Sequence, residues 1–249
     1  MQITFGRATF VAFSVASLLL IGTPALAHPD WTGLWLSADD PAHPDPIHHS
    51  APLPSAGITD ADLPLLTPKY DAIYRANRKA LFAGDLSSDK TLTCRPVGVP
   101  LNMGVPYGGE ILMTPGRVTI ITEWANDVRR IFTDGRGHPD DLDPGLEGHS
   151  IGHWEGNDLI VDTVAISPQA SLNAVGTQQS DKMHMVERFH EFEPGKLEIS
   201  YHITDPEAFL KPYDFKLYWK RNPDKADYVH EYECDNNRDA ALAKTPSVP

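Results

Sequence analysis

Histidine, aspartate and arginine gather in one segment of the chain, residues 129–163, which reads "RRIFTDGRGHPDDLDPGLEGHSIGHWEGNDLIVDT". A carboxylate beside an imidazole raises the pKa of the ring and orients it, so the pair can act as a general base. Arginine in the same place is suited to stabilise a developing anion. The segment therefore indicates acid–base chemistry, and a solvated surface loop is the alternative.

A hairpin inside this segment predicts which side chains share a face. Its turn is Gly156-Asn157, and glycine in the first loop position suits a type II′ turn. The register that follows puts His149, His153 and Asp162 on one face, with Asp162 about 7–8 Å at Cα from both histidines. The opposite face is expected to be core and carries Trp154, Leu159 and Val161.

The predicted catalytic side chains have three roles. His149 or His138 is the base, and Asp162 orients it. Arg130 or Arg136 stabilises an anion, although a surface pair of Arg136 with Asp134 is an equal alternative for that side chain. Two histidines and a carboxylate also suit zinc or non-haem iron, but no H-x-H or HExxH spacing supports a metal. We therefore predict no cofactor, with a divalent metal as the alternative.

Three further side chains are predicted to contact the substrate: His153, Glu187 and Tyr201. In "MHMVERFHEF", Glu187 shares a face with Phe189, so it points inward if Phe189 is core. A buried carboxylate must be paired, and either Arg129 or Arg130 would be its partner because these neighbours point to opposite faces. The alternative is an ion pair that only fixes the register of the core.

The first 27 residues have the pattern of a secretory signal. One positive charge, Arg7, precedes an apolar run, and Ala25-Leu26-Ala27 fits the A-x-A cleavage pattern. A membrane anchor is the alternative, but glycine and proline break the end of the apolar run. We expect cleavage, a periplasmic or secreted location and no stable membrane anchor in the mature chain.

About 220 residues would remain, which suits one all-β domain. We predict an arm rich in proline and histidine with a first strand (28–63), followed by a single β-rich domain (64–249). The net charge of −13 argues against a nucleic-acid partner, because an acidic surface repels phosphates. A small molecule is the expected partner, and homo-oligomerisation is left open. Cys94 and Cys234 are predicted to form a disulfide in the exported protein, with two buried thiols as the alternative.

One helix and about ten short strands are expected. Thr67 is a plausible N-cap, Pro68 suits the first helical position and Gly84 ends the helix, so we place it over about 67–83. Alternation of apolar and polar residues with tight turns predicts a mainly β fold, an antiparallel barrel or sandwich of the lipocalin or calycin type. The predicted strands are Trp31–Leu36, Glu110–Thr114, Val118–Glu123, Val128–Thr133, His149–Glu155, Asp158–Val164, Met183–Phe192, Leu197–Thr204, Phe215–Lys220 and Val229–Cys234.

A string of motifs resembles a broad group of exported bacterial proteins, often from proteobacteria and acidobacteria and mostly called hypothetical. The motifs are "CRPVGVP", "GGEILMTPG", "RRIFTDGRGHP", "GHSIGHWEGNDLIVDT", "ERF" and "EYECDNN", between Cys94 and Asn237. "GNDLIVDT" departs from the "GDTLVVDT" of the group but keeps Asp162 and Thr163. The G-x-W in "WTGLW" resembles the first strand of lipocalins. The resemblance to the group implies no particular reaction. The positions of this chain that match the motif pattern of the group are Arg130, Asp134, Arg136, His138, His149, Trp154, Asp162, Glu187, Arg188 and Cys234.

Three functions remain open. The leading hypothesis is a cofactor-independent acid–base enzyme, a lyase or isomerase, acting on a small aromatic or carbonyl-containing molecule. No P-loop, GxGxxG or GxSxG motif suggests other chemistry. The alternatives are a lipocalin-like binding protein without catalysis and a metal-assisted hydrolase; a purely structural envelope protein would use the same polar groups as ion pairs.

Overall fold

The computed structural model describes residues 28–42, 63–85, 87, 90, 95–105, 107–173 and 176–233. The predicted signal peptide (1–27), most of the proline-rich arm and both cysteines of the predicted disulfide lie outside these residues. Among the helices within the described ranges, none has the length and apolar character needed to cross a membrane.

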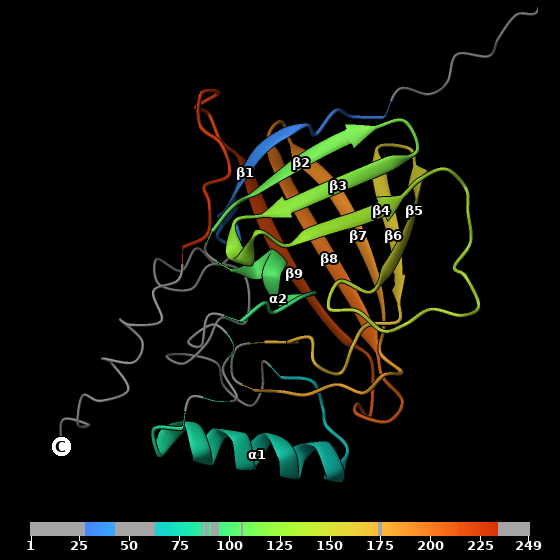
Figure 1. Ribbon diagram of the computed structural model, residues 1–249. Coiled ribbons are helices and arrows are strands. Elements are labelled where there is room, and N and C mark those ends of the chain that lie inside the picture. Colours follow the sequence, from blue (N-terminus) through green and yellow to red (C-terminus); the bar gives the residue numbers. More distant parts are fainter. Residues whose placement is uncertain are drawn as a thin grey trace, which may run out of the picture.

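Nine strands close into a barrel in sequence order, with β9 paired to β1 (Figure 1). The prediction of a mainly β barrel is therefore confirmed. Small irregular helices and one longer helix complete the fold. The strands are β1 (Gly33–Ala38), β2 (Gly109–Thr114), β3 (Arg117–Thr122), β4 (Val128–Phe132), β5 (His149–Glu155), β6 (Asp158–Val164), β7 (His184–Glu193), β8 (Lys196–Thr204) and β9 (Tyr213–Arg221); the helices are α1 (Pro68–Phe82), α2 (Leu101–Gly104) and η3 (Trp124–Asn126).

One neighbouring pair, β4 and β5, is parallel, and every other pair in the ring is antiparallel. Strand directions cannot alternate all the way around a ring of nine, so one parallel pair is unavoidable. A parallel pair needs a long connection that brings the chain back to the end where it started. Residues 133–148 make this return as an extended loop beside the barrel (Figure 1).

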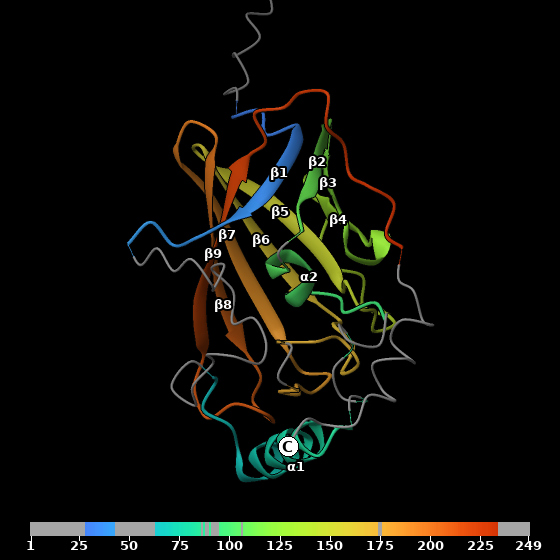
Figure 2. The same ribbon diagram turned by 90° about the vertical axis from the view of Figure 1, so that its left-hand side faces the viewer.

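The barrel interior is filled by alternate side chains of the strands. The expected alternation is present in β8, where Leu197, Ile199 and Ile203 are fully buried. The helix α2 closes part of one end, because the indole nitrogen of Trp219 donates to the backbone oxygen of Met103 at 3.0 Å. Figure 2 shows α2 within the outline of the barrel. The interior is thus a packed core rather than a pore.

Side-chain contacts of Arg221 join the first and last strands in addition to their backbone pairing. The guanidinium of Arg221 lies 4.5 Å from the ring centre of Trp35, the tryptophan of the G-x-W motif. It also donates to the backbone oxygens of Thr32 at 2.7 Å and Asp30 at 3.0 Å. A cation over an indole with two fixed acceptors holds β9 against the start of β1.

The helix α1 lies below one end of the barrel (Figure 1), at the position that the sequence predicts. Tyr70 and Tyr74 are its buried side chains. The hydroxyl of Thr67 donates to the backbone oxygen of Glu207 at 2.9 Å, so it ties the helix to the barrel instead of capping it.

The prediction of a strand at Val229–Cys234 is wrong, because the described residues of this segment, 229–233, form no strand. The reason is that β9 already pairs with β8 on one side and β1 on the other, which leaves no free edge to extend. The segment instead contacts Asn126, whose side-chain oxygen accepts from the backbone nitrogen of Tyr232 at 3.2 Å.

Candidate functional site

The hairpin of β5 and β6 has the predicted register, with His149 opposite Val164 and Ile151 opposite Asp162. Leu159 and Val161 point into the core, as expected. His149 and Asp162 therefore lie on the outer face of the barrel. The histidine and aspartate side chains do not line the interior.

A chain of hydrogen bonds on this outer face joins three histidines through one carboxylate. The Nδ1 atoms of His138 and His149 are 2.7 Å apart. Nε2 of His138 lies 3.0 Å from Oδ1 of Asp162, and Nε2 of His184 lies 2.9 Å from Oδ2 of the same carboxylate. We call His149, His138, Asp162 and His184 the histidine chain.

The parallel pairing of β4 and β5 accounts for this convergence. The return loop passes over the outer face, and backbone bonds fasten it there: Gly145 donates to Ala165 at 3.0 Å and Ser167 donates to Gly145 at 2.8 Å. His138 sits on this loop, so it is brought over β5 and β6. Hairpin register alone does not place it.

Two facing Nδ1 atoms can bond only if one of them is unprotonated and accepts. The pKa of His149 lies below its ordinary value, because of burial first and then of the charges of His138 and Arg136. Burial and these charges favour the neutral form of His149. In the tautomer in which Nε2 of neutral His138 donates to Asp162, Nδ1 of His138 accepts from Nδ1 of His149, and Nε2 of His149 keeps its lone pair. A neutral imidazole backed by an oriented histidine is the arrangement of a general base.

The predicted arginines differ in position. Arg136 lies beside the histidine chain, with its guanidinium 4.1 Å from the ring centre of Phe132, which in turn stacks on His149. It also forms an ion pair with Asp134 at 2.5 Å. Arg130 is exposed on β4, and its side chain makes no hydrogen bond or ion pair within the described part of the chain.

His153, predicted to contact substrate, is exposed at the far end of β5. Its Nε2 lies 3.0 Å from a carboxylate oxygen of Glu155, and both side chains are about two-thirds exposed, at 65% and 64%. It takes no part in the histidine chain. The predicted register keeps Asp162 diagonal to His149 and His153, but its carboxylate contacts His138 and His184.

The inward arginine is Arg129, not Arg130. Its guanidinium donates to both carboxylate oxygens of Glu187, one of them at 2.8 Å. It also donates to Thr163 at 2.9 Å and Ser150 at 3.1 Å. Burial is the largest single effect and lowers the pKa of Arg129, but the charge of Glu187 and its hydrogen bonds together leave that pKa above its ordinary value, with smaller contributions from Tyr201 and Glu147. The network extends across β4 to β7 and satisfies a fully buried ion pair.

Glu187 and Tyr201, both predicted to contact substrate, lie inside the barrel and are 0% and 2% exposed. Burial, followed by the charge of Glu187, raises the pKa of Tyr201 well above its ordinary value. A ligand outside the barrel could reach neither side chain.

A second carboxylate reaches the same interior from the return loop. Both oxygens of Glu147 accept from the side-chain nitrogen of Asn102 on α2 at 2.9 Å. Burial raises the pKa of Glu147 to about 7, against the lowering effect of Arg129 and with a smaller contribution from Asp127. This contact fastens the end of the return loop to α2.

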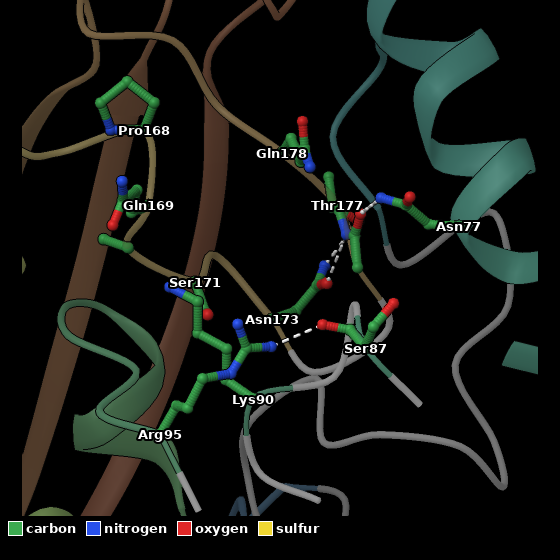
Figure 3. Close-up of a pocket in the computed structure, with 12 residues that line it drawn as sticks. Asn77, Ser87, Lys90, Arg95, Pro168, Gln169, Ser171, Asn173, Thr177 and Gln178 are labelled. Carbon is green, nitrogen blue, oxygen red and sulfur yellow. Dashed lines mark hydrogen bonds between the residues drawn. The ribbon is translucent and has the colours of Figure 1, made fainter. Parts of the chain in front are cut away.

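A cleft of about 400 Å³ lies between the barrel end and α1. Figure 3 shows its walls coming from three segments: α1, the stretch after it, and the loop between β6 and β7. The lining residues are Asn77, Ser87, Lys90, Arg95, Pro168, Gln169, Ala170, Ser171, Asn173, Gly176, Thr177 and Gln178. Sequence reasoning missed all of them, since they are scattered along the chain and form no local motif.

The cleft has a hydrogen-bonded frame. The amide nitrogen of Asn77 on α1 donates to the backbone oxygen of Gly176 at 3.0 Å, which ties the helix to the opposite wall. Asn173 donates to the hydroxyl of Thr177 at 2.9 Å (Figure 3). Arg95 donates to the backbone oxygen of Ser87 at 2.5 Å. The bond from Asn77 joins two distant parts of the chain, and the other two bonds each order one wall of the cleft.

No group of three or more histidine, cysteine, aspartate or glutamate side chains in the described residues is arranged to hold a metal ion. Within the histidine chain, both nitrogens of His138 and both carboxylate oxygens of Asp162 are directed at other members of the chain.

No family model matches the chain, and no curated protein matches it. Among solved structures, a secretary abundant heat soluble (SAHS) protein from Ramazzottius varieornatus is 12% identical with a TM-score of 0.37, covering 79% of this chain and 98% of that one. Two single-residue mutants of the fluorescent protein UnaG are each 14% identical. One has a TM-score of 0.29 and covers 54% of this chain and 87% of that one. The other has a TM-score of 0.28 and covers 47% and 72%.

Proposed function

We propose that this chain is an exported small-molecule-binding protein whose ligand occupies the cleft between α1 and the barrel end. The observation that carries the proposal is the cleft itself, about 400 Å³ with a frame of hydrogen bonds from three separate segments. This volume falls within the roughly 300–1,000 Å³ that is usual for small-molecule sites. Export is inferred from the signal-like first 27 residues.

The cleft is a better candidate than the barrel interior, where lipocalin-like carriers hold their ligands. The inward side chains of this barrel leave little room, because Ile131, Val161 and Ile199 are each fully buried by their neighbours. A groove of about 560 Å³ on the outer face includes Val186 and Lys216, but it lies over one curved sheet and lacks an opposing wall. The cleft offers walls on several sides.

Native mass spectrometry tests the proposal. The full protein is incubated with a small-molecule extract of the cells that export it, and bound masses are recorded. Gln178→Trp places a bulky ring at the exposed rim of the cleft and should abolish the bound species, whereas Lys220→Trp on the outer face of β9 should retain it. Equal binding by both variants, or no binding by the wild type, would contradict the proposal.

An acid–base enzyme of the lyase or isomerase type is the second candidate function. The observation in its favour is the contact of His149 with His138, which is in turn hydrogen-bonded to Asp162. Turnover of small aromatic and carbonyl-containing compounds, followed by NMR, should be lost in His149→Gln and kept in His153→Gln. A wild type that converts none of these compounds, or a His149→Gln variant with unchanged turnover, would exclude this candidate.

A further inference from the structure

The cleft has a charge opposite to that of the whole protein. The chain carries 34 acidic and 21 basic residues, yet the cleft is lined by Arg95 and Lys90 and by no carboxylate among the described residues. The remaining lining side chains are neutral. Acidic residues make up 34 of the 249, so a set of twelve would contain about one or two on average, and a cleft with two cations and no carboxylate among its lining residues favours an anionic ligand.

The two cations influence one another. The pKa of Lys90 lies below its ordinary value, because of burial first and then of repulsion from Arg95. Two like charges close together in a partly buried site repel each other and disfavour the charged forms. An oxyanion between them would offset the repulsion and would itself gain two charge-assisted contacts.

Arg95 is held in place for this role. Its backbone nitrogen donates to the backbone oxygen of Lys90 at 3.1 Å, and one guanidinium nitrogen donates to Ser87. A planar guanidinium carries five donors in a fixed fork, so one side chain can bind a backbone oxygen and an oxyanion together. Figure 3 shows Arg95 and Lys90 on one side of the cleft and Asn77 and Gln178 across from them.

We propose that the cleft binds an oxyanion, the carboxylate or phosphate group of a small polar molecule, between Arg95 and Lys90. This inference rests on the proposed function and names the chemical class of its ligand. Arg95 provides paired donors to two oxygens, Lys90 provides the second positive charge, and the amide side chains of Gln169 and Gln178 contact the polar remainder of the ligand.

The experiment is an NMR titration of the full ¹⁵N-labelled protein with sodium phosphate and, separately, with sodium acetate, at an ionic strength held constant with sodium chloride. We expect saturable shifts of the amide resonances of residues 87, 95 and 169–178 with one or both anions. Saturation by phosphate alone assigns a phosphate group, and saturation by acetate alone assigns a carboxylate.

Arg95→Gln with Lys90→Gln should weaken this binding at least about tenfold, while Lys220→Gln, which removes one charge from an exposed position on β9, should leave it unchanged. If the double variant fails to fold, Arg95→Lys and Lys90→Gln test the two side chains one at a time. Absence of shifts with both anions, or equal affinity in the variants and the wild type, would overturn the inference.

The failures of the two proposals are distinguishable. If neutral molecules bind in a manner that Gln178→Trp abolishes while phosphate and acetate do not bind, the binding function holds and the anionic class is wrong. If neither kind of molecule binds, both proposals are wrong.

Discussion

The guanidinium of Arg129 on β4 and the carboxylate of Glu187 on β7 form an ion pair inside the barrel, and they are 1% and 0% exposed. Ser150 and Thr163 supply the remaining acceptors for the guanidinium. Such a pair fixes the position of the strands that carry it, and removing one member leaves the other charge buried without compensation.

Arg129→Met should therefore lower the free energy of unfolding by about 3–5 kcal/mol. The double variant Arg129→Met/Glu187→Leu should recover much of this loss, because no isolated charge remains in the core. Urea denaturation followed by circular dichroism measures both. Losses that simply add in the double variant would show that the two side chains do not act as a pair.

The raised pKa of Glu147 predicts that its contribution to the free energy of unfolding decreases as the pH rises from 4.5 to about 7. Burial raises its pKa from 4.5 to about 7, so the folded protein holds a proton that the unfolded chain releases in this range. The contribution of Glu147 to stability is full below pH 4.5 and is lost as the pH rises through about 7. Glu147→Gln keeps a neutral partner for Asn102 and should be more stable than the wild type above about pH 7 and equal to it below pH 4.5. Thermal midpoints measured at both pH values check this, and a constant difference would contradict it.

The lowered pKa of His149 predicts the opposite pH dependence, a contribution to the free energy of unfolding that decreases as the pH falls. Its folded pKa lies below the ordinary value of 6.5, so the unfolded chain binds the proton more readily and stability falls as the pH drops below 6.5. Removing the charge of His138 should raise the pKa of His149, while burial keeps it below the ordinary value. Imidazole proton resonances of wild type and His138→Gln report this shift. The exposed His153 is the internal control, and a shift shared by both histidines would refute a local cause.

The contacts of Arg221 predict that the closure of the barrel between β9 and β1 depends on this side chain. Arg221→Ala removes the contact with Trp35 and two hydrogen bonds to the segment before β1, and should cost about 1–3 kcal/mol of unfolding free energy. Lys220→Ala, on the adjacent exposed position, should change it by less than about 0.5 kcal/mol. Denaturation curves of the two variants give the comparison, and equal losses would argue against the proposed role of Arg221.

Much of the local structure follows from the sequence because it depends on neighbouring residues. The turn Gly156-Asn157 and alternation of side chains suffice for the register of β5 and β6, and Gly156 adopts a φ of 64°, as such a turn requires. The same alternation directs Glu187 inward, where its buried carboxylate requires a cation as partner. It leaves open which of Arg129 and Arg130 supplies that cation, since one residue of slip exchanges them.

The amino-acid sequence specifies the β-barrel class, the position of α1 and the pairing of the central hairpin, because propensity, turn chemistry and period-two patterning act over a few residues. Only the closed barrel decides that the face with His149 and Asp162 points outward. The parallel pair of β4 and β5 then sends the return loop over that face and brings His138 to Asp162. The tertiary structure likewise assembles the cleft from Asn77, Arg95 and Gln178. These contacts join residues far apart in the chain, and no local pattern encodes them.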